Sequence, residues 1–562
     1  MLLILLSWTY IFITAVNFGC ITNRFFRLKM DSIPVTAFLG LFTITILAGF
    51  WALFTRVNFE FHMILLLINL LIWFRYRIDI QSLYRNGITQ FKSFSPSHRL
   101  LLCVIGIIIL ANSAAAPFIV DNESYYIQTI KWLNEYGYVH GVANLHIFLG
   151  QQSGWHLTQS ALNFSFLYSE FNDLGGFCLL LGNFFAFSLL QDFSENRNRN
   201  SLIFGLFPIF NVLLLQFANA PSPDLPVYIL TFLIVYYFVA EFNKATGNGF
   251  IVTCILTIFA VFIKSTAAGL VVFPMILIIR NFTGNQRDLF RILGAVLALS
   301  VLFVSKNYVT SGHPLFPIVW SPGGAHAVPD AVANFYFSMT KLFGYRISLA
   351  EFSHMSATDL FITWLQLPKL HGFFNWLLLV LVAITPFFLL KIKQRQWWLV
   401  YSAMLFQIAI LAISSPQYRF FLHFILLFLC VLLSVIIPRR LITSAVGVST
   451  FIAVFVTLTS INLSSLTNNP LNGTTNTLGV SNLVFPHADS NRVTAFIPLT
   501  EGNLQYYSPA DHPFFWGTGD GPLPCVNGAQ IEYFKKHLRV VPQLLGSDLS
   551  EGFYARELSP IE

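Results

Sequence analysis

Long apolar segments recur along the whole chain, separated by shorter polar connections. Each segment has close to the roughly 20 residues that an α-helix needs to cross a bilayer, and there are about 14 of them. They cover residues 2–20, 33–54, 59–74, 100–118, 174–191, 201–218, 225–240, 250–263, 266–279, 289–305, 372–390, 397–413, 420–437 and 441–461. This pattern predicts an all-α polytopic membrane protein with about 14 transmembrane helices.

Composition and charge support a membrane location. The chain is 56% hydrophobic and only 10% charged, whereas a soluble domain carries roughly 25% charged residues. Basic residues gather on alternate connections, such as Arg24 to Lys29 and Arg439 to Arg440. The positive-inside rule makes these connections cytoplasmic and the N-terminus external. The net charge of +7 therefore lies on short loops, which argues against nucleic-acid binding and predicts a multi-pass protein of the cytoplasmic (inner) membrane.

Three segments longer than ordinary connections fall on the opposite, extracytoplasmic face. Two are loops, at 119–173 and 306–371, and the third is the tail at 462–562. We expect a transmembrane domain at 1–461 that includes both loops, followed by a small extracytoplasmic α+β domain. Long structured loops carry function more often than short ones, so we expect any chemistry on this face.

An acidic motif begins three residues after the apolar segment 100–118. It reads Asp121-Asn-Glu-Ser-Tyr-Tyr126, with carboxylates at Asp121 and Glu123. Charge at such a depth indicates a functional site. Asp121 could instead cap the helix expected at 125–136, but a cap leaves Glu123 unexplained. Apolar residues on one stripe of that helix predict that it lies in the plane of the membrane interface.

Polar and aromatic residues continue along the first loop. Asn144 and His146 precede a glycine-containing segment that ends at Trp155 and His156. This mixture is typical of a pocket wall, and equally of an interfacial turn anchored by Trp155. None of the thirteen histidines belongs to a tight ligand pair such as HExxH, which argues against a dedicated zinc site. A divalent cation at Asp121 and Glu123 is the favoured metal hypothesis.

Three further charged residues lie on the same side as Asp121. Asp224 ends a proline-rich turn and could be a simple helix cap. Lys264 divides one apolar run into two short pieces, which indicates a broken helix lining a cavity. Arg419 lies at the external end of another segment, and both cations could equally be snorkelling. Together the acids and cations suit a phosphate-bearing lipid substrate, whose phosphate the cations hold.

Nucleotide-binding and hydrolase motifs are missing from the sequence. There is no P-loop, no GxGxxG motif followed by a cytoplasmic domain, and no G-x-S-x-G elbow. A Rossmann-type nucleotide-sugar enzyme is therefore excluded. A sugar donor would have to reach the external face in another form.

An ordered set of short motifs resembles the GT-C-type glycosyltransferases, and more closely a bacterial branch of membrane proteins near that superfamily. The motifs span most of the chain: Asp121 to Gln128, Trp132 to Tyr136, Gly141 to His146, Ser222 to Pro226, Phe262 to Lys264, Ser311 to Pro317, Pro416 to Arg419 and Pro522 to Cys525. The resemblance implies that the cysteine of the last motif pairs with another a few residues upstream, and this chain departs from that pattern. Phe514 to Trp516 occupies that region here, so Cys525 is left alone.

The resemblance implies an integral membrane enzyme that takes a sugar from a polyprenyl-phosphate donor. It would transfer that sugar, with inversion, to an extracytoplasmic glycan, lipid or protein acceptor. Asp121 corresponds to the family's catalytic base, with Glu123 as its partner. Substrate binding is expected from Tyr125, Asn144, His146, His156, Asp224, Lys264, His313 and Arg419.

Two other functions fit parts of the same pattern. A polymerase or ligase of lipid-linked polysaccharide would share the lipid-phosphate substrate, with its dominant loop within 306–371. A non-catalytic lipid or sugar transporter would show related halves and charges near the bilayer midplane. The single acidic motif at the membrane surface favours the glycosyltransferase.

Overall fold

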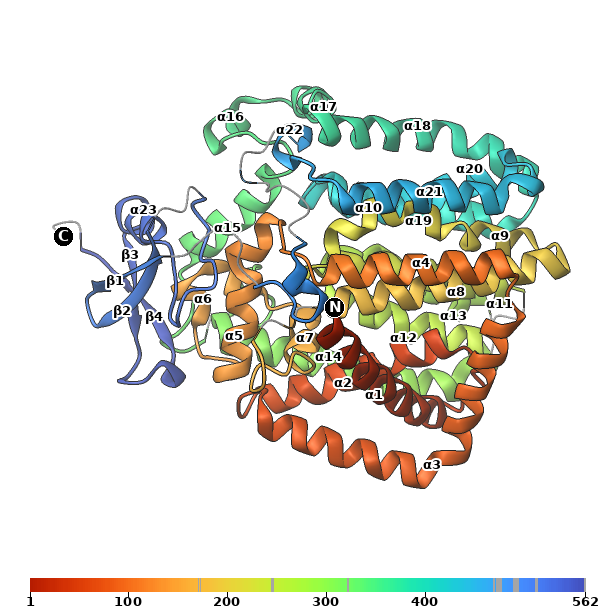
Figure 1. Cartoon of the computed structure of the whole chain (residues 1–562). Helices are drawn as coiled ribbons and strands as arrows, with labels where there is room; N and C mark the ends of the chain where they lie inside the picture. Colours follow the sequence, from red (N-terminus) through yellow and green to blue (C-terminus); the bar gives the residue numbers. More distant parts are fainter. Residues whose placement is uncertain are drawn as a thin grey trace.

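The computed structural model describes residues 1–169, 171, 173–243, 247–280, 282–320, 323–467, 471, 478–488, 495–510 and 514–559. A bundle of long helices makes up most of it, with a small β region at one end (Figure 1). The bundle helices are α1 (Leu2–Phe26), α2 (Ile33–Ala52), α3 (Phe59–Ser93), α4 (Pro96–Ser113), α8 (Leu174–Asn196), α9 (Arg199–Gly205), α10 (Asn211–Leu214), α11 (Asp224–Glu241), α12 (Asn248–Ile263), α13 (Val272–Arg280), α14 (Phe282–Ser311), α18 (Lys369–Ile392), α19 (Arg395–Ser414), α20 (Tyr418–Ile436) and α21 (Ile442–Leu458).

The all-α polytopic architecture is confirmed, whereas the expected number of about 14 spans is not. Within the described residues, 11 helices are long and apolar enough to cross a membrane, and α12 and the segment Ser265–Arg280 are shorter. The segment that we expected at 59–74 belongs to α3, which continues as a helix to Ser93 with a kink at Tyr76. The stretch between the predicted segments 59–74 and 100–118 is therefore largely helical.

The bundle is held by close approach of small residues and by buried amides. A Cβ atom at Gly19 would lie 1.9 Å from the Thr36 carbonyl oxygen, and one at Gly40 would lie 1.8 Å from that of Ala15. Only glycine allows α1 and α2 to approach so closely, as is common between membrane helices. Between α1 and α3, the Asn17 side chain donates to the Asn69 Oδ1 atom at 2.6 Å.

The three long segments gather at one end of the bundle, on the left in Figure 1. They form α5 (Ile127–Glu135), α6 (Val142–Leu145), α7 (Gly154–Ser160), α15 (Asp330–Leu342), α16 (Leu349–His354), α17 (Ala357–Leu365), α22 (Leu463–Thr467) and α23 (Gly528–Leu538). Two antiparallel hairpins complete the tail: β1 (Phe496–Glu501) with β2 (Leu504–Pro509), and β3 (Val540–Leu544) with β4 (Phe553–Glu557). The second loop is shorter than expected, because α14 extends to Ser311 and α18 begins at Lys369.

The tail packs directly on the first loop. The Phe553 N–H donates to the His140 carbonyl oxygen at 2.8 Å, and Lys131 pairs with Asp520 at 2.5 Å. Helix α5 consequently lies buried between the tail and the bundle, with Trp132 and Leu133 fully buried. The expectation that the apolar stripe of this helix faces the membrane interface is wrong, because Leu133 packs into the core of the bundle and Tyr126 and Ile130 are also buried.

Candidate functional site

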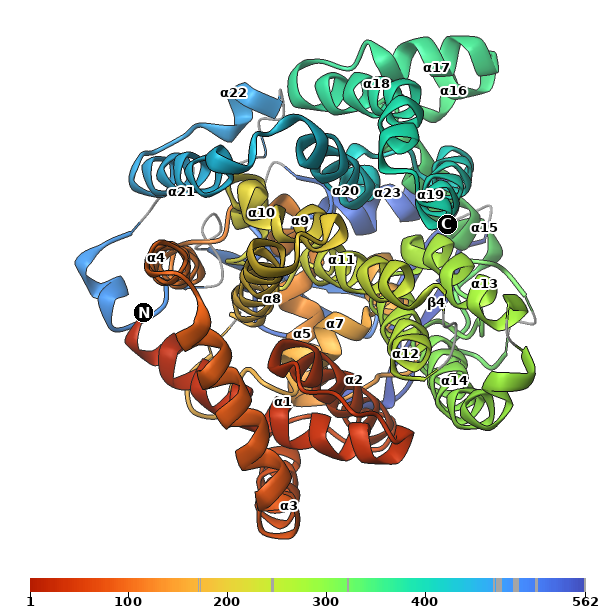
Figure 2. The same ribbon diagram turned by 90° about the vertical axis from the view of Figure 1, so that its right-hand side faces the viewer.

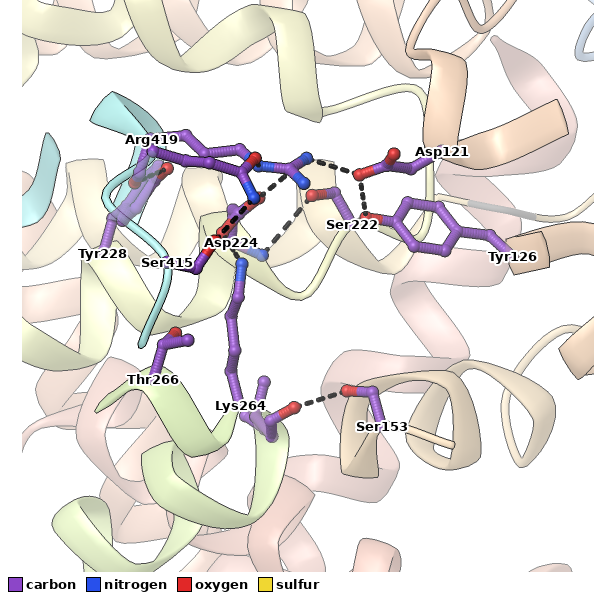
Figure 3. A network of polar contacts seen from close by, with 12 residues as sticks. Asp121, Tyr126, Ser153, Ser222, Asp224, Tyr228, Lys264, Thr266, Ser415 and Arg419 are labelled. Atoms are coloured by element: carbon purple, nitrogen blue, oxygen red, sulfur yellow. Dashed lines mark hydrogen bonds and ion pairs between the residues drawn. The ribbon is translucent and has the colours of Figure 1, made fainter. Parts of the chain in front are cut away.

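Four charged side chains from four separate parts of the chain meet at the loop-bearing end of the bundle (Figure 3). Asp121 follows α4, Asp224 is the first residue of α11, Lys264 follows α12 and Arg419 lies in the first turn of α20. Arg419 forms an ion pair with Asp121, and Lys264 forms one with Asp224. Arg419 Nη1 also lies 4.0 Å from Asp224 Oδ2, which links the two pairs. We refer to these four residues as the charge cluster.

Exposure divides the charge cluster into an inner and an outer pair. The side chain of Asp224 is 2% exposed and that of Lys264 is 16% exposed. The side chains of Arg419 and Asp121 are 26% and 22% exposed. A buried charge needs a partner of opposite sign to offset its desolvation, which the inner pair provides. The outer pair is the more exposed, so a substrate reaches Asp121 and Arg419 first, while Lys264 keeps a smaller exposed surface beside them.

Neutral side chains hold Arg419 in place. Its Nε atom donates to the Gln417 Oε1 atom at 3.0 Å, and the Gln417 amide donates to the Ser415 hydroxyl at 3.0 Å. The Tyr228 hydroxyl donates to the Arg419 carbonyl oxygen at 2.7 Å. The Phe420 ring lies 5.2 Å from the Arg419 guanidinium carbon. The guanidinium is therefore oriented before any ligand binds.

Lys264 is placed by the end of a helix. Helix α12 stops at Ile263, and Lys264 has extended backbone geometry, with φ −152° and ψ 116°. The Ser153 hydroxyl donates to the free Ile263 carbonyl oxygen at 2.5 Å, which ties this helix end to α7. The Lys264 Nζ atom lies 4.0 Å from the Phe420 ring centre, a favourable cation–π position. The predicted break in the helix is confirmed, and it directs a cation into the protein instead of into lipid.

Helix capping does not account for either aspartate. Asp121 precedes a short π-helical turn at Asn122–Tyr126, yet its side chain makes no capping hydrogen bond. Its Oδ2 atom accepts from the Tyr126 hydroxyl at 3.4 Å and pairs with Arg419. Asp224 likewise makes no capping bond, since Pro223 occupies the cap position. Asp224 nevertheless lies where the positive end of the α11 dipole favours a carboxylate.

An aromatic group borders Asp121. The rings of Tyr125 and Tyr126 lie 4.7 Å apart, and the ring of Tyr126 lies 4.7 Å from that of His156. Burial lowers the pKa of His156 to about 3, so this imidazole is neutral near pH 7. Burial, reinforced by the nearby Asp121 carboxylate, raises the pKa of Tyr125, so its phenol stays protonated. Trp155 is fully buried and is no interfacial anchor.

Three predicted substrate-binding residues lie instead where the loops pack together and against the tail. The Asn144 amide donates to the His326 carbonyl oxygen at 2.8 Å. The His146 Nε2 atom lies 3.2 Å from the Trp516 carbonyl oxygen, and the His313 Nε2 atom lies 2.7 Å from that of Val328. We call this region, Asn144, His146, His313 and their partners, the loop–tail interface. Each of the three side chains contacts a backbone carbonyl oxygen, so these residues hold segments of the chain together.

Glu123 is also part of the contact with the tail. It is 2% exposed, and its backbone carbonyl oxygen accepts from the N–H groups of Thr518 and Gly519, each at 2.8 Å. Among the described residues, no group of three or more His, Cys, Asp or Glu is placed to hold a metal ion. A divalent cation at Asp121 and Glu123 stays a prediction.

Several residues of the site were not predicted. Tyr126, Ser222 and Gln417 lie inside the quoted motifs, beside residues that we did single out. The Asp224 N–H donates to the Ser222 hydroxyl at 3.4 Å. Tyr228 and Phe420 follow charged residues by four positions and one position, on helices that start at the site. In the sequence, only the closeness of these residues to a motif indicated that they belong to the site.

Comparison with known proteins assigns the chain to a family. A family model described as a domain of unknown function (DUF8201) matches residues 1–426. The chain belongs to this family. The match contains all four members of the charge cluster and ends within α20, so the tail lies outside it. No curated protein and no solved structure matches the chain.

Proposed function

We propose that this DUF8201 protein is a membrane glycosyltransferase of the GT-C type. It moves a sugar from a polyprenyl-phosphate donor to an extracytoplasmic acceptor, with inversion at the anomeric carbon. The observation that supports this most is the charge cluster, which combines a reachable carboxylate with two oriented cations. Lipid phosphate chemistry needs both kinds of group at one place on the membrane surface.

Asp121 takes the role of general base in this proposal. As the acceptor oxygen forms a bond to the anomeric carbon, its proton passes to the Asp121 carboxylate. The bond from that carbon to the phosphate oxygen breaks, and its electron pair stays on the departing lipid phosphate. The protonated phenol of Tyr125 and the neutral imidazole of His156 line this region without competing for the proton.

Arg419 and Lys264 take the role of phosphate ligands. In the structure Arg419 pairs with Asp121, which leaves the base partly neutralised. A donor phosphate would attract Arg419, and Asp224, 4.0 Å away, stays close enough to keep it in the site. Donor binding would thus free Asp121 to accept a proton. The cations then stabilise the negative charge that grows on the leaving group.

The two other functions are less well supported. A polymerase with its chemistry in the second loop would draw on residues 312–368, yet none of the charge cluster's ion pairs in the described parts of the chain involves that segment. A transporter would hold its charges near the bilayer midplane. The charge cluster instead lies at helix ends, on the face with the long segments.

The test is Asp121→Asn in purified protein supplied with radiolabelled polyprenyl-phosphate sugars. Loss of a general base should lower transfer at least a hundredfold. Stability should fall by only about 1 kcal/mol, because the ion pair that is lost is partly exposed. Asp520→Asn, which breaks the ion pair between the tail and Lys131 of α5, is the matched control and should keep its transfer rate. A well-folded Asp121→Asn protein that transfers sugar at the wild-type rate would show that Asp121 is not the general base.

A further inference from the structure

A second polar hollow lies at the opposite end of the bundle. Its volume is about 480 Å³, within the range of small-ligand sites. Its walls come from the C-terminal end of α1, the first turn of α12 and the N-terminal part of α14, and they include Arg27, Asn248, Arg287 and Arg291. Lys264 follows the other end of the 16-residue helix α12, so the hollow is separated from the charge cluster by about 24 Å at 1.5 Å per residue.

The hollow carries an excess of positive charge. Three arginines line it, against one carboxylate, Asp288. Arg291 pairs with Asp288 at 3.1 Å. Within the described part of the chain, Arg27 and Arg287 take part in no ion pair. Two guanidinium groups from different helices thus face the same space with their donors available to an anion.

The walls of this hollow are fixed to one another. The Asn248 side chain forms two hydrogen bonds with the Lys29 backbone: its Oδ1 atom accepts from the N–H at 3.1 Å, and its amide donates to the carbonyl oxygen at 2.9 Å. This ties the connection after α1 to the start of α12. At Gly247, which lines the hollow, a Cβ atom would meet nothing within 4 Å. Two hydrogen bonds therefore hold the α1 and α12 sides of the hollow together, and there is free space beside Gly247.

Its surroundings place it at the bilayer surface. Phe26 and Ile251 supply apolar lining, and the neighbouring Phe25 and Phe290 are exposed on the outside of α1 and α14. Seen along the bundle from this end, α14 lies at the edge of the molecule, with α12 next to it on the inner side (Figure 2). A basic hollow between helices, next to exposed aromatic rings, is typical of sites for anionic lipid headgroups.

We propose that this hollow binds the phosphate of an anionic phospholipid, with Arg27, Arg287 and Arg291 as its ligands. The arginines hold the phosphate oxygens, and the acyl chains lie along the exposed rings of Phe25 and Phe290. The site is independent of the charge cluster and of the function proposed for it.

Lipid binding to purified protein tests this assignment, by native mass spectrometry with added phosphatidylglycerol or phosphatidylcholine. The wild type should bind phosphatidylglycerol at least tenfold more tightly than phosphatidylcholine. A triple variant with Arg27→Gln, Arg287→Gln and Arg291→Gln should lose that preference. A double variant with only Arg27→Gln and Arg287→Gln leaves the Arg291–Asp288 ion pair intact, so it tests the binding of phosphatidylglycerol even if the triple variant does not fold. Arg439→Gln with Arg440→Gln, at the same end of the bundle, is the control.

Three results would overturn the proposal. Equal binding of the two lipids by the wild type would show that the protein does not select the anionic headgroup. Unchanged phosphatidylglycerol binding in the double and triple variants would show that the lipid binds at another site. If inorganic phosphate binds with the same dependence on the three arginines and phosphatidylglycerol does not bind, the ligand of the hollow would be a soluble anion and not a lipid. Asp121→Asn should bind phosphatidylglycerol like the wild type, so this test succeeds or fails separately from the transfer assay.

Discussion

The charge cluster and the loop–tail interface both bury polar residues at the same end of the bundle, but they do so in different ways. At the loop–tail interface, Asn144, His146 and His313 meet backbone carbonyls. In the charge cluster, four ionised groups satisfy one another, and the outer two keep a solvent-facing surface. Polar residues that meet backbone groups serve packing, whereas the partly exposed charges of Asp121 and Arg419 remain available for exchange with a charged ligand.

The largest effect is expected from removing one member of the inner pair. Asp224→Leu leaves Lys264 buried beside Arg419 without its carboxylate, which should cost about 3–5 kcal/mol of unfolding free energy. Denaturant titration in detergent measures this loss. Asp224→Leu combined with Lys264→Met replaces the whole pair by apolar groups and should recover most of the stability. A double variant as unstable as the single one would mean that Lys264 is not held by Asp224.

A pH-dependent effect is expected at the loop–tail interface. Burial lowers the pKa of His146 to about 4, below the value of about 6.5 in an unfolded chain. The unfolded chain therefore binds a proton first, so stability is full above pH 6.5 and falls as the pH drops towards 4. The loss reaches about 3 kcal/mol and levels off below pH 4. His146→Gln, which can still donate to the Trp516 carbonyl, should flatten this part of a stability–pH curve. An unchanged curve would assign the dependence to other groups.

A smaller effect is expected on binding of the lipid carrier. Lys264→Gln and Arg419→Gln should each weaken binding of a polyprenyl phosphate ten- to a hundredfold, because a charge-assisted contact contributes roughly 1.5–3 kcal/mol. Microscale thermophoresis with the carrier lipid measures the change. Arg24→Gln, which breaks an exposed ion pair with Asp79, should leave the affinity within about twofold. If both Gln variants bind the carrier with wild-type affinity, the donor does not bind at the charge cluster.

Much of the architecture follows from the apolar pattern. Each predicted segment is mostly helical, because a segment that spans a bilayer must satisfy its own backbone hydrogen bonds, although the helix in 201–218 is divided into short pieces. Alternation of sides from span to span also placed Asp121, Asp224, Lys264 and Arg419 on one face. The exception is α3, since an amphipathic helix can continue past the apolar stretch along the membrane surface without a change that hydropathy detects.

Assigning roles within the site was harder. An aspartate at a helix start can cap that helix or reach a distant cation, and the local sequence is the same in both cases. Asp121 and Asp224 do the second, with Arg419 and Lys264. A histidine in a long loop can bind a substrate or a backbone carbonyl. His156 lies beside Asp121, whereas His146 and His313 bind carbonyls that have no signature in the sequence.

The pairing of Asp121 with Arg419 also bears on how the protein is made. These residues are 298 positions apart, and a ribosome adds about 5–20 residues per second. Asp121 therefore leaves the ribosome about 15–60 s before its partner is synthesised. During that interval its carboxylate has no guanidinium beside it, and the earlier helices must enter the membrane without this contact. The site is completed only when α20 arrives, so a chain that stops before that helix lacks Arg419 and leaves Asp121 without its ion-pair partner.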